Sequence, residues 1–198
     1  MTADLPVRFV TTFPSSLGWM AAIGSGCTLE ELTFGHASMQ SALDALDPRL
    51  VQGARRAKWN LALIRRLRAY ASGTPDDFRD VRVDPGAVTP FQRRVIACCR
   101  RIPLGSTASY GELAAKAGSP GAARAVGQCM AANRIPLVIP CHRVVASDGG
   151  LCGYSAAGGL AMKRRLLELE AAMVRQGRPP PAGSSLTSFP ESLLESLR

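Results

Sequence analysis

Residues 72–90 interrupt the hydrophobic pattern of this 198-residue chain and separate two parts of different character. The stretch contains Ser-Gly-Thr-Pro, several acidic residues and Asp-Pro-Gly, a composition typical of a linker. A chain of this length, with 46% hydrophobic residues, buries a core in one or two domains. We predict an N-terminal domain over 1–73, a linker over 74–88, a second domain over 89–174 and a disordered Pro- and Ser-rich tail over 175–198.

Positive charge is concentrated in the second part. Up to Pro85 there are 10 Lys and Arg against 9 Asp and Glu, a net charge of +1. From Gly86 onward the counts are 14 and 6, a net charge of +8. A basic lobe favours a polyanionic partner, most often nucleic acid, although a solvated basic surface without a partner is an equal alternative.

The apolar segments and the cysteines indicate a cellular compartment. No apolar run approaches the roughly 18 to 20 residues that span a bilayer, and the first residues lack the basic and apolar regions of a signal peptide. The six cysteines and two histidines have no metal-ligand spacing, so we expect reduced thiols and neither a metal nor a cofactor. We predict a cytoplasmic protein that does not bind membranes and, in a bacterium, one associated with the nucleoid.

The first part has an α/β pattern. Three β-rich runs separated by turn residues, 7–13, 19–23 and 29–34, predict a small antiparallel sheet. From Pro48 to Leu67 apolar residues recur at three- and four-residue steps with arginines between them, which predicts one amphipathic helix. We interpret the arginine-rich face as a solvated surface and the whole domain as a scaffold for the second part.

Three helix starts are indicated by capping residues in the second part. Thr89-Pro90-Phe91-Gln92 and Ser109-Tyr110-Gly111-Glu112 are capping boxes, and Ser119-Pro120 predicts an N-cap followed by proline. The last two predicted helices are separated only by Gly118 and Ser119. This spacing is typical of a helix-turn-helix DNA-binding unit and also of a simple packing motif.

The third of these helices, from Pro120 to about Ala132, is rich in Gly and Ala, and Arg124 is its only charged residue. Such short side chains have little reach toward base edges in the major groove. Two alternatives remain open. The helix either packs closely against a neighbouring helix or lies in the minor groove of DNA, with Arg124 as a wedge or phosphate contact and with binding independent of sequence.

The segments that follow are short. Ile135–Pro140 is apolar and punctuated by prolines, which predicts a buried extended segment that delivers Cys141 rigidly. Val144-Val145 followed by Asp148-Gly149-Gly150 predicts a hairpin. A final helix is predicted from Leu160 to about Met173.

Cys141 differs from the other five cysteines, which we interpret as inert small apolar residues. It lies between Pro140 and His142-Arg143, which supply a base and a positive field that favour the thiolate. Because neighbours on an extended chain point to opposite sides, His142 is expected to act through a bridging water rather than directly. Glu170 or Glu168 of the final helix would orient its imidazole.

Pro140-Cys141-His142-Arg143-Val144, preceded by Asn133 and by Ala122-Ala123-Arg124-Ala125-Val126-Gly127, resembles the O6-alkylguanine-DNA alkyltransferases, also called methylated-DNA–protein-cysteine methyltransferases. The resemblance is strong over residues 89–172 and weaker in the first 70. It implies a ribonuclease-H-like N-terminal α/β domain and a mainly α, winged helix-turn-helix-like second domain.

The resemblance also implies direct-reversal DNA repair by a monomer. An alkyl group would pass irreversibly from O6-alkylguanine, and from O4-alkylthymine, to Cys141, so the protein is consumed as it acts. The partner would be double-stranded DNA with alkylated bases, bound largely without regard to sequence. No cofactor would take part.

The catalytic residues implied by the resemblance are Cys141, His142, Glu170, Tyr110 and Asn133. His142 would withdraw the thiol proton through water while Glu170 holds the imidazole. Tyr110 would donate a proton or a hydrogen bond to N3 of the base. Asn133 would brace the turn that leads to Cys141.

The implied DNA-binding residues are Arg124, Ala122, Ala123, Ala125 and Gly127. Arg124 would fill the stack that the damaged nucleotide leaves when it flips out, and the small residues would meet the minor groove.

The implied substrate pocket contains Met130, Val144, Tyr154, Ser155 and Lys163. The loop after Tyr154 is two residues longer than the usual family pattern. Ser155 or Ala157 is therefore the candidate contact to the base oxygen, and the range of accepted alkyl groups is open. Two other classes remain alternatives: a non-enzymatic alkylated-DNA binder or helix-turn-helix regulator, against which Cys141 argues, and a Cys-His hydrolase, which would turn over.

Overall fold

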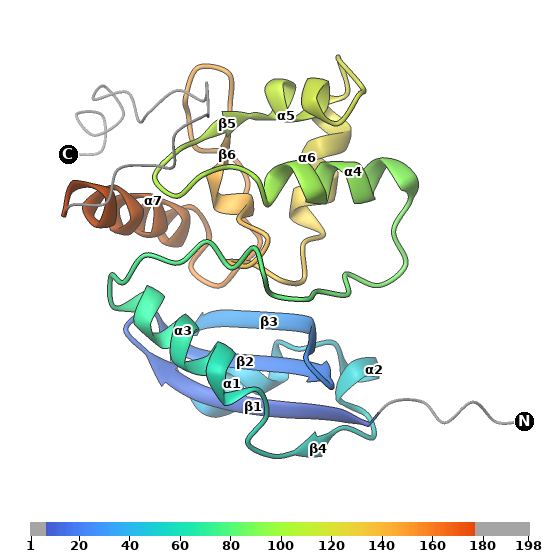
Figure 1. The fold of residues 1–198 in the computed structure, drawn as a ribbon, viewed down its shortest axis with the longest axis vertical. Helices are drawn as coiled ribbons and strands as arrows, with labels where there is room; N and C mark the ends of the chain where they lie inside the picture. Colours follow the sequence, from blue (N-terminus) through green and yellow to red (C-terminus); the bar gives the residue numbers. More distant parts are fainter. Residues whose placement is uncertain (1–6, 177–198) are drawn as a thin grey trace, which may run out of the picture.

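The computed structural model describes residues 7–176. A sheet formed by the N-terminal part lies below a mainly helical part in the view of Figure 1. Residues 1–6 and 177–198 lie outside the described part, and with them all but the first two residues of the predicted tail. Between residues 7 and 176, every helix is too short or too polar to traverse a lipid bilayer.

The predicted antiparallel pairing of the first three strands is confirmed. They are β1 Arg8–Ser15, β2 Gly18–Ser25 and β3 Thr28–His36. A two-residue strand, β4 Arg55–Arg56, pairs in parallel with β1, and the order is β3-β2-β1-β4. The sheet is therefore mixed rather than purely antiparallel, because the free edge of β1 offers backbone groups that a later segment satisfies.

The single helix predicted from Pro48 to Leu67 is wrong. One turn of helix, α2 Pro48–Val51, ends before Gly53, whose φ of +78° turns the chain toward β4. Helix α3 Leu61–Ala71 starts only after Asn60, whose side chain accepts a hydrogen bond from the Leu63 amide. The apolar spacing spans two helices with a strand between them, because pairing with β1 outweighs the local helical pattern.

The two faces of the sheet are covered differently. Helix α1 Met39–Asp44 contributes Ala42 and Leu43 to a small cluster with Val10 and Ile23. The opposite face packs against α3 and against the second part of the chain. Buried residues of both parts form one continuous core, which includes Leu32, Leu67, Val95 and Leu166.

The second part contains four α-helices and a 3-10 turn. They are α4 Pro90–Cys99, α5 Tyr110–Lys116, α6 Ala123–Ala131, η1 Cys141–Arg143 and α7 Gly159–Arg175. The capping boxes at Thr89 and Ser109 are confirmed. The helix start at Ser119-Pro120 is wrong, because Gly121 has a φ of +87° and α6 begins after Ala122 without a side-chain cap.

The chain between α6 and α7 also differs from the prediction. Ile135–Pro140 is buried but not extended: the Ile139 amide donates to the Ile135 carbonyl, and Leu137 has a φ of +70°. No hairpin follows, because strand β6 Val144–Val145 pairs in parallel with β5 Ala108–Ser109 instead. A turn at Asp148-Gly149 closes the loop beyond β6.

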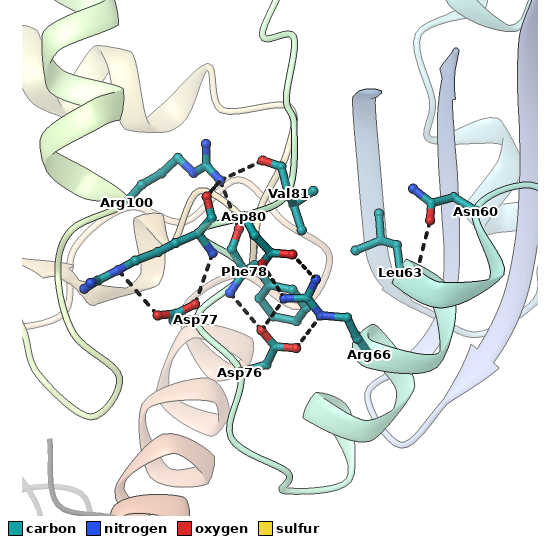
Figure 2. Close-up of polar contacts among 10 residues, drawn as sticks. Asn60, Leu63, Arg66, Asp76, Asp77, Phe78, Asp80, Val81 and Arg100 are labelled. Carbon is teal, nitrogen blue, oxygen red and sulfur yellow. Dashed lines mark hydrogen bonds and ion pairs between the residues drawn. The ribbon is translucent and has the colours of Figure 1, made fainter. Parts of the chain in front are cut away.

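The segment over 74–88 contains no helix or named strand and connects the two parts, with Phe78 and Val81 buried. Arg66 of α3, which we expected on a solvated face, forms ion pairs with Asp76 and Asp80 (Figure 2). Arg100, just after α4, donates to the carbonyls of Phe78 and Val81, as Figure 2 also shows. These contacts fix α3 relative to the helical part.

A second set of contacts joins β3 to the segment after α6. The Leu32 amide donates to the Arg134 carbonyl. The Arg134 guanidinium pairs with Glu31 at 3.2 Å and with Asp47 at 2.7 Å. Asn133 therefore stands next to a residue that is held by the N-terminal sheet.

Candidate active site

Cys141 begins the 3-10 turn η1 and is only 5% exposed. Its backbone amide donates to the Ile139 carbonyl. The Asn133 side-chain amide donates to Cys141 Sγ at 3.1 Å and to the Ile139 carbonyl at 2.8 Å. Asn133 thus binds the sulfur and the turn that carries it, the position that we expected for it.

Glu170 of α7 lies at the centre of a buried polar cluster behind the sulfur. Its Oε1 lies 2.9 Å from His142 Nε2 and accepts from Arg143 Nη2 at 2.8 Å. Its Oε2 accepts from Arg143 Nε and from the Gly105 amide. All these side chains are 0–2% exposed, and Glu168, the other candidate, is exposed.

The protonation of this cluster follows from its geometry. Burial alone would raise the pKa of Glu170, but Arg143 and His142 outweigh it and hold that pKa well below the ordinary value. Glu170 is thus a carboxylate, and His142 must carry its hydrogen on Nε2. Burial lowers the pKa of His142 despite Glu170, which leaves a neutral imidazole whose Nδ1 has no hydrogen-bond partner among the described residues.

The thiol itself is not ionised by its neighbours. Burial raises the pKa of Cys141, while Asn133, Lys163 and the backbone amides at Cys141 and His142 act in the opposite direction. We expected Arg143 to supply the positive field, and that expectation is wrong. The Arg143 guanidinium faces Glu170 and the Ile102 carbonyl, because a buried cation requires partners of its own.

An open cavity of about 680 Å³ lies on the other side of the sulfur. Nine of the lining residues are Tyr110, Ala123, Arg124, Gly127, Met130, Cys141, Cys152, Tyr154 and Ser155. Of the predicted pocket residues, Met130, Tyr154 and Ser155 line this cavity. Val144 and Lys163 do not: both are fully buried, and Lys163 Nζ donates to the Val144 carbonyl at 2.7 Å and to the Cys152 carbonyl at 3.1 Å.

Tyr110 stands at the start of α5, in the wall of the cavity. Its hydroxyl donates to the Cys152 carbonyl at 3.3 Å, and Lys163 Nζ lies 5.9 Å from its ring centroid. Burial and the neighbouring Cys152 raise the pKa of Tyr110 above its ordinary value. The phenol therefore stays protonated at neutral pH and is available as a donor.

Helix α6 presents small residues beside the same cavity. Arg124 is exposed, while Ala122, Ala123, Ala125 and Gly127 are half-buried. Ala123 and Gly127 line the cavity, and Ala122 and Ala125 do not. A Cβ built on Gly127 would lie 3.8 Å from the Tyr110 ring, so no close helix packing requires glycine there.

The longer loop after Tyr154 reaches the N-terminal sheet. Ser155 lines the cavity, whereas a Cβ built on Gly35 of β3 would lie only 3.1 Å from the Ala157 carbonyl. Gly35 also has a φ of +85°. The extra length is therefore accommodated against β3, which leaves Ser155 rather than Ala157 beside the cavity.

Tyr70 of α3 is a residue of this cluster that the sequence analysis missed. Its hydroxyl donates to Glu170 Oε1, and its side chain is 1% exposed. The two residues are 100 positions apart, and no local motif connects them. Within residues 7–176, no three His, Cys, Asp or Glu side chains come together as metal ligands.

The fold and site define a class of protein in which a buried cysteine, braced by an amide and backed by a His–Glu pair, opens onto a cavity beside a helix of small residues. A family model described as 6-O-methylguanine DNA methyltransferase, DNA binding domain, matches residues 90–172. The methylated-DNA–protein-cysteine methyltransferase of Mycobacterium tuberculosis H37Rv is 38% identical over 161 residues, 80% of this chain and 90% of that protein. The chain belongs to the methylated-DNA–protein-cysteine methyltransferase family.

Solved structures agree with this assignment. The crystal structure of Mycobacterium tuberculosis O6-methylguanine methyltransferase superposes with a TM-score of 0.68 at 34% identity, over 84% of this chain and 94% of that one. A structure described as Mycobacterium tuberculosis OGT in complex with DNA gives a TM-score of 0.67 at 35% identity, over 83% and 94% of the two chains.

Proposed function

We propose that the protein repairs alkylated DNA by direct reversal, moving the alkyl group from O6 of guanine to Sγ of Cys141. The observation that carries this proposal is the position of that sulfur. Cys141 lines the open cavity, its sulfur accepts from the Asn133 amide at 3.1 Å, and the next residue of η1 is His142 of the buried His142–Glu170 pair. A flipped-out base is the substrate that such a cavity beside α6 would accept.

The proposed proton path begins with the neutral thiol. The Cys141 proton passes through a water molecule to Nδ1 of His142, and Glu170 stabilises the imidazolium that forms. The sulfur lone pair then bonds to the alkyl carbon. The bond between that carbon and O6 breaks, and its electron pair stays on the guanine.

Tyr110 assists the departure of guanine in this scheme. Its protonated hydroxyl donates to N3 of the base, which offsets the negative charge that develops on the ring. Its present partner, the Cys152 carbonyl, is 3.3 Å away, a long bond that a substrate atom can replace. The product is a thioether at Cys141, and each protein molecule acts once.

Several finer features belong to the same proposal. The protein acts as a monomer on double-stranded DNA, largely without regard to sequence, in the cytoplasm or at a bacterial nucleoid. It also accepts O4-alkylthymine. Arg124 enters the base stack, and the small residues of α6 contact the minor groove. The N-terminal domain, 1–73, is of the ribonuclease-H-like type, and the second domain, 89–174, is of the winged helix-turn-helix type.

Mass spectrometry tests the proposal directly. The protein is mixed with a duplex that contains one O6-methylguanine, and its peptides are then measured. We expect one methyl group on the peptide with Cys141, together with an equal amount of restored guanine. Restored guanine with an unmodified peptide, or more than one product molecule per protein, would indicate a hydrolase instead.

A further inference from the structure

The N-terminal part contributes a hydroxyl to the buried cluster behind the sulfur. Tyr70 is on α3, and its hydroxyl donates to Glu170 Oε1. The same oxygen lies 2.9 Å from His142 Nε2 and 2.8 Å from Arg143 Nη2. One carboxylate oxygen thus faces donors from two distant segments of the chain.

The ring of Tyr70 is held from its other side. It packs edge to face against Phe78, with centroids 5.4 Å apart. The Arg66 guanidinium lies 5.4 Å from the Phe78 ring centroid and pairs with Asp76 and Asp80, as Figure 2 shows. The hydroxyl therefore points to Glu170 because α3 and the segment after it fix the ring.

The orientation of the Glu170 carboxylate depends on which donors contact each of its two oxygens. Arg143 contacts both of its oxygens, and the Gly105 amide donates to Oε2. Tyr70 adds a donor on Oε1 only, the oxygen that faces His142. Oε1 thus faces donors from three residues, His142, Arg143 and Tyr70, and the Tyr70 hydroxyl helps to hold this oxygen at His142 Nε2.

We infer that Tyr70 is a positioning residue for alkyl transfer, whose hydroxyl holds Glu170 Oε1 against His142 Nε2–H and so keeps Nδ1 free to receive the thiol proton. This role rests on the proposed function. It gives the N-terminal part a direct effect on the reaction, beyond that of a scaffold.

The role has a consequence for pH dependence. Groups with a charge or a titratable proton surround the His142–Glu170 pair and its partner Arg143. They are Tyr70 of α3, Cys141 of η1, Lys163 of α7 and Tyr154 of the loop before α7, with Cys99 of α4 near Arg143. Loss of the Tyr70 hydroxyl makes Glu170 a stronger acceptor, which favours the imidazolium form of His142. Because the base must be neutral, the acid limb of the rate–pH profile should move to higher pH.

The test compares three variants with the wild-type protein. Tyr70→Phe removes the hydroxyl and keeps the ring. Ser72→Ala removes a hydroxyl from the end of the same helix, where it faces Ser16 at 3.0 Å. Phe78→Leu loosens the packing around Tyr70 and keeps its hydroxyl. Single-turnover methyl transfer from an O6-methylguanine duplex is followed from pH 5 to 9, with the active fraction titrated for each protein.

We expect Tyr70→Phe to transfer about tenfold more slowly at pH 7, as for loss of a hydrogen bond to a buried charge, with its acid limb at higher pH and DNA binding unchanged. Ser72→Ala should match the wild type. Phe78→Leu should lower the melting temperature and move the acid limb in the same direction as Tyr70→Phe but by less, because the hydroxyl is kept while its ring is held less firmly.

Two results would overturn the inference alone. One is Tyr70→Phe with the rate and acid limb of the wild type. The other is Tyr70→Phe that fails to fold or loses only its active fraction, since Tyr70 would then be structural. A wild-type protein that transfers no methyl group would overturn the proposed function, and this inference with it.

Discussion

The residues on the two sides of Cys141 differ in burial and charge. Behind the sulfur, His142, Arg143, Glu170 and Tyr70 are buried, and their polar atoms bond mainly to one another. In front of it, the cavity is bordered by the small residues of α6 and by one exposed cation, Arg124. The back is a buried charged cluster, and the front is an open cavity.

The difference indicates a division of labour. Charges that are paired in a buried site are costly to desolvate and therefore tolerate only one arrangement, which suits a group that must receive a proton at one atom. Small side chains and an exposed arginine bind weakly on their own and adapt to a large polyanion. We therefore expect changes behind the sulfur to alter chemistry and stability, and changes in front to alter the use of duplex DNA.

Removal of the sulfur between the two sides should have the largest effect. Cys141→Ser keeps the size of the side chain but supplies a far weaker nucleophile, so no alkyl group should be transferred. Binding of damaged duplex should be retained. Gel-shift and peptide mass measurements check both expectations, with Cys27→Ser, an exposed cysteine on a β-turn, as the control that keeps activity. Alkyl transfer by Cys141→Ser would show that the Cys141 sulfur is not the alkyl acceptor.

Glu170→Gln tests the charged back of the site. It leaves Arg143 buried without its carboxylate, and we expect a loss of about 3–5 kcal/mol in the free energy of unfolding. Transfer should slow by about 100-fold, because His142 loses the group that stabilises its charged form. Urea unfolding and single-turnover rates measure the two effects. The control is Glu168→Gln, an exposed position on the same helix, which should change stability by less than about 0.5 kcal/mol.

The back of the site should also make wild-type stability depend on pH. The pKa of Glu170 is below its ordinary value of 4.5, so its contribution is present above that pH and is lost as the pH falls. The pKa of His142 is below its ordinary value of 6.5, so burial of the neutral ring is also progressively opposed by acid. Unfolding free energy should therefore fall from pH 7 toward pH 3, and less steeply in Glu170→Gln below pH 4.5. Equal slopes in the two proteins would contradict the ionised state of Glu170.

Arg124→Ala tests the front. Repair of a duplex lesion should fall about tenfold, because the cost of holding a flipped base is no longer offset by a side chain in the stack. Transfer from a free O6-alkylguanine base should be unchanged. Arg164→Ala, which removes an exposed cation from α7, serves as the control. Equal losses on duplex and free base would show that Arg124 affects the transfer step itself. They would contradict the proposed division between residues for transfer and residues for duplex binding.

Gly127→Ala should give the smallest effect. It distinguishes contact with the minor groove from helix packing as the reason for the small residues of α6. The added methyl group meets only the Tyr110 ring, at 3.8 Å, so the fold should gain about 0.5–1 kcal/mol from a better helix former. Duplex repair should nevertheless fall, by about threefold, because the face of α6 next to the cavity is thicker. Thermal unfolding and duplex repair rates measure the two changes. Unchanged repair would favour helix packing as the reason for the small residues.

The sequence by itself determined the features that depend on near neighbours. The capping boxes at Thr89 and Ser109 satisfy helix amides within four residues, so they identified the starts of α4 and α5 correctly. Three β-rich runs separated by turn residues identified the antiparallel strands β1, β2 and β3. The Pro-Cys-His-Arg-Val motif indicated the family and made Cys141 the proposed acceptor, because its five residues are consecutive in the chain.

Only the tertiary structure decided what depends on partners far along the chain. Arg55 and Arg56 became a strand because β1 had a free edge, and Arg143 turned away from the sulfur because Glu170 required a buried cation. The bond from Tyr70 to Glu170 joins residues 100 positions apart. Such pairs form when a buried polar group must be satisfied by whichever donor the packing brings within reach, and no local pattern of residues records that choice.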